Sequence, residues 1–391
     1  MTSFGLYIHV PFCVGKCPYC DFVSFPFASL PAGTSERIVA ALEREMDLVL
    51  KARPALAERP LASIYFGGGT PSLLDPLVVQ RLVARARAAF RQAGAHADGR
   101  PRPEVTIECN PASAEMERLA AFARAGVNRV SLGVQSLDDA TLRALGRRHS
   151  AAEARAACAR VRALGLASWG LDLIYGAPVA DDAARFGRDL DEALAFQPPH
   201  VSVYGLTLHE GTPLWERHER GEVQLPDEET QRAEFLLARR RLTAAGLHHY
   251  EISNYARPGH ESRHNSLYWT GGEYVGLGVA AHSFYDDVRR ANPSDLEEYL
   301  RRVEAGCPPA QAEEPPSPRA RAAERIMLAL RQCKGVSVGV LSREIGQDFE
   351  KTYAAEIAQL EAADLLVREA GQVRLTQEGL LLSDRVFEEF Y

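Results

Sequence analysis

The chain has 391 residues, of which 46% are hydrophobic and 25% charged, the balance of a soluble globular protein with about two or three domains. Its 45 basic and 52 acidic residues give a net charge of −7, which argues against nucleic acid as a partner because contacts to phosphates need a basic surface. Seven unevenly spaced cysteines do not resemble a disulfide framework, and from the sequence we expect neither a secretory leader nor a transmembrane segment. We therefore expect a reduced, cytoplasmic protein.

Short strands alternate with helical segments over residues 1–246. Strands are predicted at 6–10, 63–66, 105–108, 129–134, 171–175 and 200–206. Helices are predicted at about 35–51, 75–93, 113–125, 151–164, 182–195 and 228–245. Strand–helix units in series form a parallel sheet with right-handed crossovers, so the pattern predicts an α/β fold, as a partial barrel or an open doubly wound sheet.

The remaining chain divides into three segments. Residues 247–307 are expected to extend the barrel, with about 247–285 rich in Gly, Tyr and His and poor in helical periodicity, and 308–318 are expected to form a Pro-rich linker. Residues 319–391 predict three helices, a hairpin around Gly371 and a final helix, an order that resembles a winged helix. This segment has ten basic and twelve acidic residues, which favours a structural or partner-docking role over DNA binding.

Three cysteines follow the first predicted strand. Cys13, Cys17 and Cys20 have the spacing Cys-x3-Cys-x2-Cys. A structural zinc site normally has four protein ligands, and no fourth Cys or His lies nearby at a suitable spacing. A [4Fe–4S] cluster held by three cysteines leaves one iron open to an outside ligand. Zinc and incidental packing are the alternatives, and the incomplete ligand count favours the cluster.

Glycines and polar residues follow the other predicted strands. The run Gly67-Gly68-Gly69-Thr70-Pro71 leaves backbone groups bare for a ligand, or forms a plain tight turn. Glu108, Gln135 and Asp172 lie toward the carboxyl ends of the third, fourth and fifth strands, where α/β barrels build their sites. Each of these three residues alone could be a structural polar group. The cysteines follow the first strand at the same end of the sheet, so together these residues indicate a site.

Together with Tyr19 beside the third cysteine, these motifs resemble the radical S-adenosylmethionine (SAM) superfamily. The resemblance implies a partial (β/α)6 barrel, a [4Fe–4S] cluster on Cys13, Cys17 and Cys20, and SAM bound to the open iron. It also implies a set of cofactor-binding residues along the barrel: Tyr7, Tyr19, Gly68, Gly69, Thr70, Glu108, Gln135, Arg147, Asp172 and Thr207.

Longer strings resemble the oxygen-independent coproporphyrinogen III oxidase family within that superfamily. They are Ile107-Glu108-Cys109-Asn110-Pro111, Ser131-Leu132-Gly133-Val134-Gln135-Ser136 and Asp172-Leu173-Ile174-Tyr175-Gly176. Two features depart from the oxidases themselves: Asp21-Phe22 replaces the Gly-Cys that follows their third cysteine, and the first strand begins close to Met1 without an extra arm. Both departures, with an HNxxYW motif at 264–269, resemble the haem-chaperone (HemW-type) branch.

The HNxxYW motif has two interpretations. His264 is a candidate haem ligand, with Tyr268 and Trp269 as flat apolar surface, because His is a common axial ligand. Alternatively, His264 forms structural hydrogen bonds at the edge of the barrel. Other histidines are rival haem ligands: His248, His249 and His282.

The resemblance implies a haem chaperone that binds the cluster, SAM and haem, and delivers haem to haem proteins, the respiratory chain included. No catalytic residue is assigned, and contact with a membrane surface is left open. The rival enzyme is a coproporphyrinogen III dehydrogenase of porphyrin biosynthesis. A radical SAM enzyme that modifies tRNA is a second rival, but it would need a second cysteine cluster or a basic domain, and neither is visible.

Overall fold

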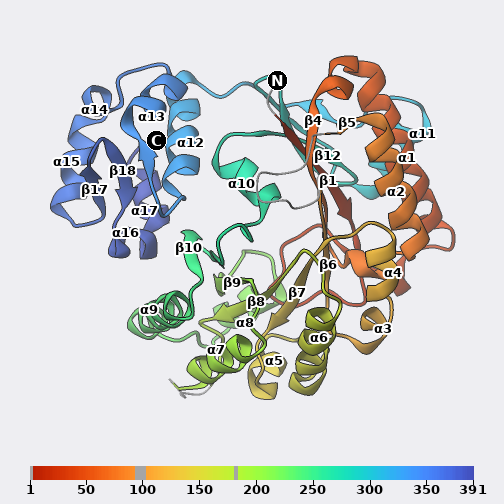
Figure 1. Ribbon diagram of the computed structural model, residues 1–391, viewed down its shortest axis with the longest axis horizontal. Coiled ribbons are helices and arrows are strands. Elements are labelled where there is room, and N and C mark those ends of the chain that lie inside the picture. Colours follow the sequence, from red (N-terminus) through yellow and green to blue (C-terminus); the bar gives the residue numbers. More distant parts are fainter. Residues whose placement is uncertain (1–2, 93–102, 180–183) are drawn as a thin grey trace.

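Six parallel strands form the centre of the molecule, in the spatial order β9-β8-β7-β6-β4-β1 (Figure 1). The computed structural model describes residues 3–92, 103–179 and 184–391. Each of the six predicted strands is confirmed, within three residues at either end: β1 (Phe4–Val10), β4 (Pro60–Gly68), β6 (Glu104–Cys109), β7 (Arg129–Gln135), β8 (Ser168–Tyr175) and β9 (His200–Gly205).

Helices connect these strands and cover the outer face of the sheet. The predicted helices are present as α1 (Thr34–Ala52), α2 (Pro76–Ala89), α3 (Ser113–Met116) with α4 (Leu119–Arg124), α6 (Ala151–Ala163), α7 (Arg185–Ala195) and α9 (Glu228–Ala244). The prediction of one helix over 113–125 was wrong, because the segment divides into α3 and α4. Predicted helical residues 91 and 92 instead form the short strand β5 (Arg91–Gln92), which pairs with β4. Predicted helical residues 93, 182 and 183 lie outside the described residues. Two short α-helices among these connections were not predicted: α5 (Asp139–Ala144) and α8 (Pro213–Glu219).

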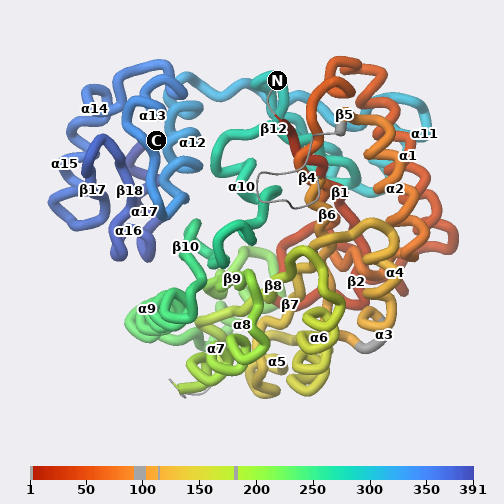
Figure 2. The backbone as a smooth tube through the Cα atoms, in the orientation of Figure 1, coloured from red at the N-terminus to blue at the C-terminus, as the bar shows by residue number. Residues whose placement is uncertain are grey.

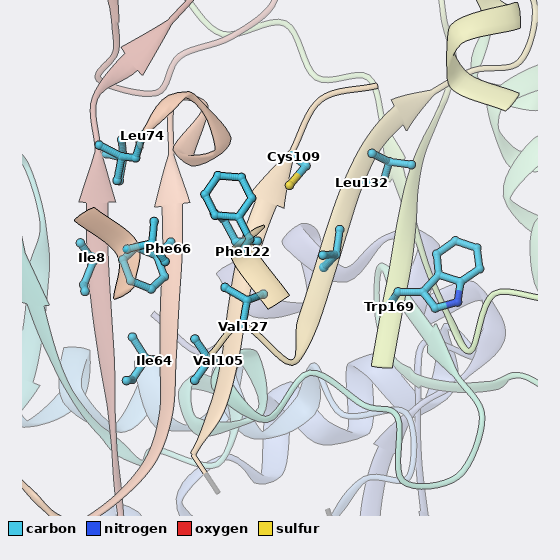
Figure 3. Packing of buried hydrophobic residues seen from close by; sticks show 14 of the residues in the cluster. Ile8, Ile64, Phe66, Leu74, Val105, Cys109, Phe122, Val127, Leu132 and Trp169 are labelled. Atoms are coloured by element: carbon cyan, nitrogen blue, oxygen red, sulfur yellow. The ribbon is translucent and has the colours of Figure 1, made fainter. Parts of the chain in front are cut away.

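Alternation along the strands separates an apolar outer face from a polar interior. Ile8, Phe66 and Leu132 of the strands belong to the same buried cluster as Phe122 of α4, and all are nearly inaccessible to solvent (Figure 3). Burying side chains of this kind contributes about 1.5–3 kcal/mol each. The inward positions carry residues such as Glu108 and Arg129, so the interior of the barrel is polar and available for a site.

The segment 247–307 extends the sheet at both edges. β10 (His248–Glu251) and β11 (Asn254–Ala256) add antiparallel strands beside β9, whereas β12 (Glu273–Leu277) pairs parallel with β1. Between them the chain crosses the barrel through α10 (Arg263–Trp269), as Figure 2 shows. β13 (His282–Tyr285), β14 (Val288–Ala291) and β15 (Gln311–Ala312) continue the same edge, and α11 (Leu296–Glu304) lies between the last two in sequence. Among the described residues, the two ends of this row of strands do not pair with each other, so the barrel is partial.

The C-terminal segment folds around its own core beside α9 and α10 (Figure 1). Its elements are α12 (Pro318–Leu330), β16 (Val336–Ser337), α13 (Val338–Ile345), α14 (Phe349–Thr352), α15 (Ala354–Ala362), β17 (Leu366–Glu369), β18 (Gln372–Leu375), α16 (Gln377–Leu381) and α17 (Ser383–Glu388). The predicted hairpin is confirmed, and its turn residues Ala370 and Gly371 both have positive φ, as a tight two-residue turn requires. The prediction of three helices before the hairpin and one after it was wrong, since four helices, α12 to α15, precede it and two, α16 and α17, follow it.

Contacts between the barrel and the C-terminal segment are specific. The guanidinium of Arg331 lies 4.3 Å from the centre of the Trp269 ring and donates to buried Glu251 at 3.2 Å. Phe235 of α9 packs into the C-terminal core. Within the described residues, no helix is both long and apolar enough to cross a membrane.

A buried glutamate of α1 is hydrogen-bonded to three places in the segment 247–307. Glu45 of α1 is fully buried and accepts hydrogen bonds from the Gly278 amide and the Tyr299 hydroxyl, each at 2.8 Å, and from Asn292 at 2.6 Å. Burial raises the pKa of Glu45 to about 7, because the low-dielectric surroundings disfavour its charged form despite the three donors.

We expect Glu45→Gln to flatten the pH dependence of stability. Between the ordinary pKa of 4.5 and the folded value of about 7, the folded state binds a proton that the unfolded state has released. The free energy of unfolding therefore falls as pH rises through that window, by about 3 kcal/mol in total, and Glu45→Gln removes this contribution. Urea unfolding of cluster-free protein at pH 4.5–7.5 measures it. Glu36→Gln, an exposed change on the same helix, is the control, and equal slopes for both variants would contradict the assignment.

Candidate functional site

The three cysteines lie in a loop that closes on itself at the carboxyl end of β1. This cysteine loop, residues 11–24, includes β2 (Phe12–Cys13) near its start and is followed by β3 (Phe25–Pro26), which pairs with β2. The Phe25 amide donates to the Pro11 carbonyl at 2.7 Å, and a ring nitrogen of His9 lies 2.8 Å from the Val23 carbonyl. These bonds fix the shape of the loop from its two ends.

A glycine loop, residues 67–70 at the carboxyl end of β4, supports the cysteine loop from the neighbouring strand. The Gly69 amide donates to the Val10 carbonyl at 2.9 Å, and the Thr70 amide donates to the Phe12 carbonyl at 2.6 Å. A Cβ atom on Gly69 would lie 2.4 Å from the Phe12 carbonyl oxygen, closer than any side chain allows. Gly68 has φ +109° and sits against the His9 ring. These two glycines are therefore needed for the contact between the loops, a reason that the sequence alone did not reveal.

Cys13, Cys17 and Cys20 are free, partly exposed thiols that line one cavity of about 640 Å³. The Cys13 sulfur lies 3.6 Å from the Thr70 hydroxyl. Within the described part of the chain, no three Cys, His, Asp or Glu side chains converge closely enough to hold a single metal ion. All three thiols therefore border the same cavity. Burial raises the pKa of the Cys20 thiol.

Arg147 ties the cysteine loop to the ends of two strands. Its Nη1 donates to the Cys17 sulfur at 3.3 Å and lies 3.5 Å from the Tyr19 hydroxyl. Its Nη2 donates to Asn110 Oδ1 at 2.6 Å and to the Gly133 carbonyl at 3.0 Å. The guanidinium therefore positions the loop as well as bordering the cavity.

Two half-buried carboxyl groups face the same cavity from the strands. Glu108 accepts a hydrogen bond from the Tyr65 hydroxyl at 2.7 Å, and burial raises the pKa of Glu108 to about 7. Asp172 accepts from the Ser131 hydroxyl at 3.3 Å, and burial raises its pKa too. The Arg129 guanidinium, one layer deeper in the barrel, opposes both shifts because its positive charge favours the carboxylates.

Most of the predicted site residues meet at this cavity. It is lined by Cys13, Cys17, Cys20, Tyr19, Gly68, Gly69, Thr70, Glu108, Gln135, Arg147, Asp172 and Thr207. The prediction missed further lining residues: Asn110, Ser131, Tyr204 and His209. Asn110 follows Glu108 by two residues in a string that carries the family resemblance, and the inward alternation of their strands could have found Ser131 and Tyr204. His209 lies in a loop, where no periodicity points to it.

Tyr7 and His264 are not among the residues that line this cavity. The Tyr7 hydroxyl bonds to His9 at 3.1 Å, and its ring stacks on Tyr65 inside the barrel. In register Tyr7 lies beside Tyr65, below the layer of Glu108. It supports the floor of the site from underneath.

The HNxxYW motif forms α10, which closes the amino end of the strands, opposite the cysteines. His264 is 1% exposed, with Nδ1 2.8 Å from the Ser63 hydroxyl and Nε2 2.8 Å from the hydroxyl of Tyr268, one helical turn further along α10. Burial lowers the pKa of His264 to about 3. Both ring nitrogens are already bonded, so of the two interpretations the geometry supports the structural one.

The rival histidines also lie away from the cavity. His249 stacks on Tyr255 with ring centres 4.2 Å apart, and its Nε2 lies 2.9 Å from the Ile252 carbonyl. His248 is exposed on β10, and His282 is exposed on β13 beside Glu313. Cys109 borders the cavity, but its side chain is 3% exposed and packs in the main core (Figure 3).

Comparisons with known proteins agree with this geometry. Residues 7–185 match the Radical SAM superfamily, and residues 317–382 match the HemN C-terminal domain. "Heme chaperone HemW" of Mycobacterium tuberculosis is 36% identical over 98% of this chain and 93% of its own length. HemW of Bacillus subtilis is 30% identical, covering 98% of both chains. The chain belongs to the HemW family.

A solved structure shows the same fold as this HemW-family chain. The coproporphyrinogen III oxidase HemN of Escherichia coli, a radical SAM enzyme, superimposes with a TM-score of 0.80 over 100% of this chain and 90% of its own. The two sequences are 22% identical, so the likeness concerns the fold alone. It confirms the predicted α/β radical SAM architecture.

We expect Gly69→Ala to prevent cluster incorporation in this HemW-family protein. The added methyl group would push the Phe12 carbonyl, and with it the start of the cysteine loop, away from the glycine loop. Iron and sulfide analysis after anaerobic reconstitution should show less than about a tenth of the wild-type cluster, the outcome of a well-packed site that cannot relax. Gly339→Ala is the control, since its new methyl group has no neighbour closer than 3.9 Å. A normal cluster content in Gly69→Ala would contradict the contact.

Proposed function

We propose that this protein is a haem chaperone that binds a [4Fe–4S] cluster, SAM and haem, and delivers haem to haem proteins. The observation that carries the proposal is the cavity with three free cysteines, in a chain that matches curated HemW proteins over nearly its whole length. Further parts of the proposal are respiratory-chain proteins as recipients and the cytoplasm as location.

The residues around the cavity fit the two cofactors. Cys13, Cys17 and Cys20 would hold three irons, which leaves the fourth open to SAM. The backbone of Gly68 and Gly69, with the acceptors Glu108 and Asp172, offers hydrogen bonds to the amino group and hydroxyls of SAM. When bound, such a pair of cofactors supplies one-electron chemistry, whereas the protein supplies positioning and electrostatics.

Arg147 and Arg129 have separate tasks in this proposal. Arg147 holds the cysteine loop through Cys17 and keeps it against Asn110. Arg129 partly offsets the rise in pKa that burial causes in Glu108 and Asp172, because its positive charge favours their charged forms. Tyr65 orients Glu108 from below.

The residues after the third cysteine favour a chaperone over a dehydrogenase. Phe22 is 62% exposed and the Asp21 side chain is 48% exposed, so both line the cavity at its solvent-exposed rim. Radical chemistry on a substrate needs exclusion of water from reactive intermediates. An open mouth suits the docking and release of a large flat cargo such as haem.

The test combines haem transfer with product analysis. Anaerobically reconstituted protein should bind hemin and pass it to an apo b-type cytochrome, seen as growth of the cytochrome's own Soret band. Given SAM, dithionite and coproporphyrinogen III, the same preparation should form no protoporphyrinogen IX above a cluster-free control.

Two variants control this experiment. Joint replacement of Cys13, Cys17 and Cys20 by Ala should remove nearly all iron and sulfide, whereas Cys307→Ala, at an exposed cysteine away from the cavity, should leave the cluster intact. Formation of protoporphyrinogen IX would overturn the proposal in favour of the dehydrogenase. Failure to bind hemin would overturn it altogether.

A further inference from the structure

The mouth of the cavity carries an unusual combination of exposed side chains. The cysteine loop contributes Val14, 49% exposed, and Phe22, 62% exposed, with Lys16 between them in sequence. The loop before α6 contributes Arg148, and the loop after β9 contributes His209. An imidazole, apolar groups and cations therefore border one opening.

His209 has a carboxylate near one ring nitrogen and, among the described residues, leaves the other without a partner. Its Nδ1 lies 3.5 Å from Oδ2 of Asp21, and its side chain is 46% exposed. In the part of the chain that the structure describes, its Nε2 has no hydrogen-bond partner. Histidines that bind metals commonly present their second ring nitrogen to a carboxylate, which fixes the tautomer and aims the free nitrogen.

The other histidine at this cavity lacks that freedom. His149 is 6% exposed, its Nε2 lies 3.0 Å from the Val134 carbonyl, and burial lowers its pKa to about 4. His264 is bonded at both nitrogens at the far end of the barrel. Of these three histidines, His209 is the one that both lines the cavity and has a half-exposed side chain.

The surroundings of His209 match the chemistry of a porphyrin. Phe22 and Val14 offer apolar surface to its ring, as does Tyr204, which is 40% exposed at the end of β9. Lys16 and Arg148 are exposed and line the same mouth, so they can pair with two propionates. Two acids also border this region: Asp21, which faces His209, and Glu153, which caps α6 by bonding Ser150.

We propose that haem binds across the mouth of this cavity with Nε2 of His209 as an axial ligand of the iron and Lys16 and Arg148 against the propionates. This inference rests on the proposed function, since it assigns the place of the cargo. The haem would then lie over the cluster site and leave the depth of the cavity to SAM.

Titration of hemin into anaerobically reconstituted protein tests the assignment. His209→Ala should shift the Soret band of the complex, change the electron paramagnetic resonance signal of the ferric haem, and weaken hemin binding about tenfold or more. The oxidised [4Fe–4S] cluster is diamagnetic and does not obscure that signal. In His209→Gly, added imidazole should restore the wild-type spectrum by occupying the vacated position.

His282→Ala is the matched control. Nδ1 of His282 lies 3.3 Å from the Glu313 carboxylate and its side chain is 61% exposed, but it does not line the cavity, so hemin binding should not change. Wild-type hemin binding together with an unaltered spectrum and affinity in His209→Ala would overturn the ligand assignment alone. A wild-type protein that binds no hemin would overturn the proposed function with it.

Discussion

The close approach of two backbone segments determines the geometry of the site. The Thr70 amide donates to the Phe12 carbonyl at 2.6 Å, and the missing side chain of Gly69 leaves room for that same carbonyl. This contact joins the cysteine loop after β1 to the glycine loop after β4, two adjacent parallel strands. Since Cys13 follows Phe12 directly, any displacement here would move the first thiol relative to the other two. Arg147 makes the second connection, from Cys17 to the ends of β6 and β7.

The polar interior of the barrel divides into two ends with different tasks. At the carboxyl end, Glu108 and Asp172 face an open cavity with the cysteines. At the amino end, α10 closes the barrel, with His264 bonded to Ser63 and Tyr268, and with Glu104 accepting from the first amides of the helix. Trp269, the last residue of α10, contacts the guanidinium of Arg331 in the C-terminal segment. The HNxxYW motif therefore connects the barrel to the C-terminal segment through packing and hydrogen bonds, whereas the proposed haem position lies at the opposite end.

The sequence predicted the repeated parts of this architecture and missed the parts set by tertiary contacts. Alternating strands and amphipathic helices predicted the six parallel strands, and the cysteine spacing pointed to the loop that lines the cavity. Periodicity could not predict that β12 would pair with β1, because residues 273–277 join a strand more than 260 residues earlier in the chain. It also could not distinguish an iron-ligating His264 from a hydrogen-bonded one, since that depends on Ser63 from β4. The sequence did not predict His209 as a site residue for the same reason, because its partner Asp21 lies in another loop.

Three cysteines that hold a cluster with one iron open toward the cavity are central to the proposed function. Mössbauer spectroscopy of protein reconstituted with ⁵⁷Fe tests this arrangement most directly. One iron in four should change its isomer shift when SAM is added, because SAM takes the position that no cysteine fills. Four irons that stay unchanged while SAM binds would mean that the protein supplies a fourth ligand, and would contradict the arrangement.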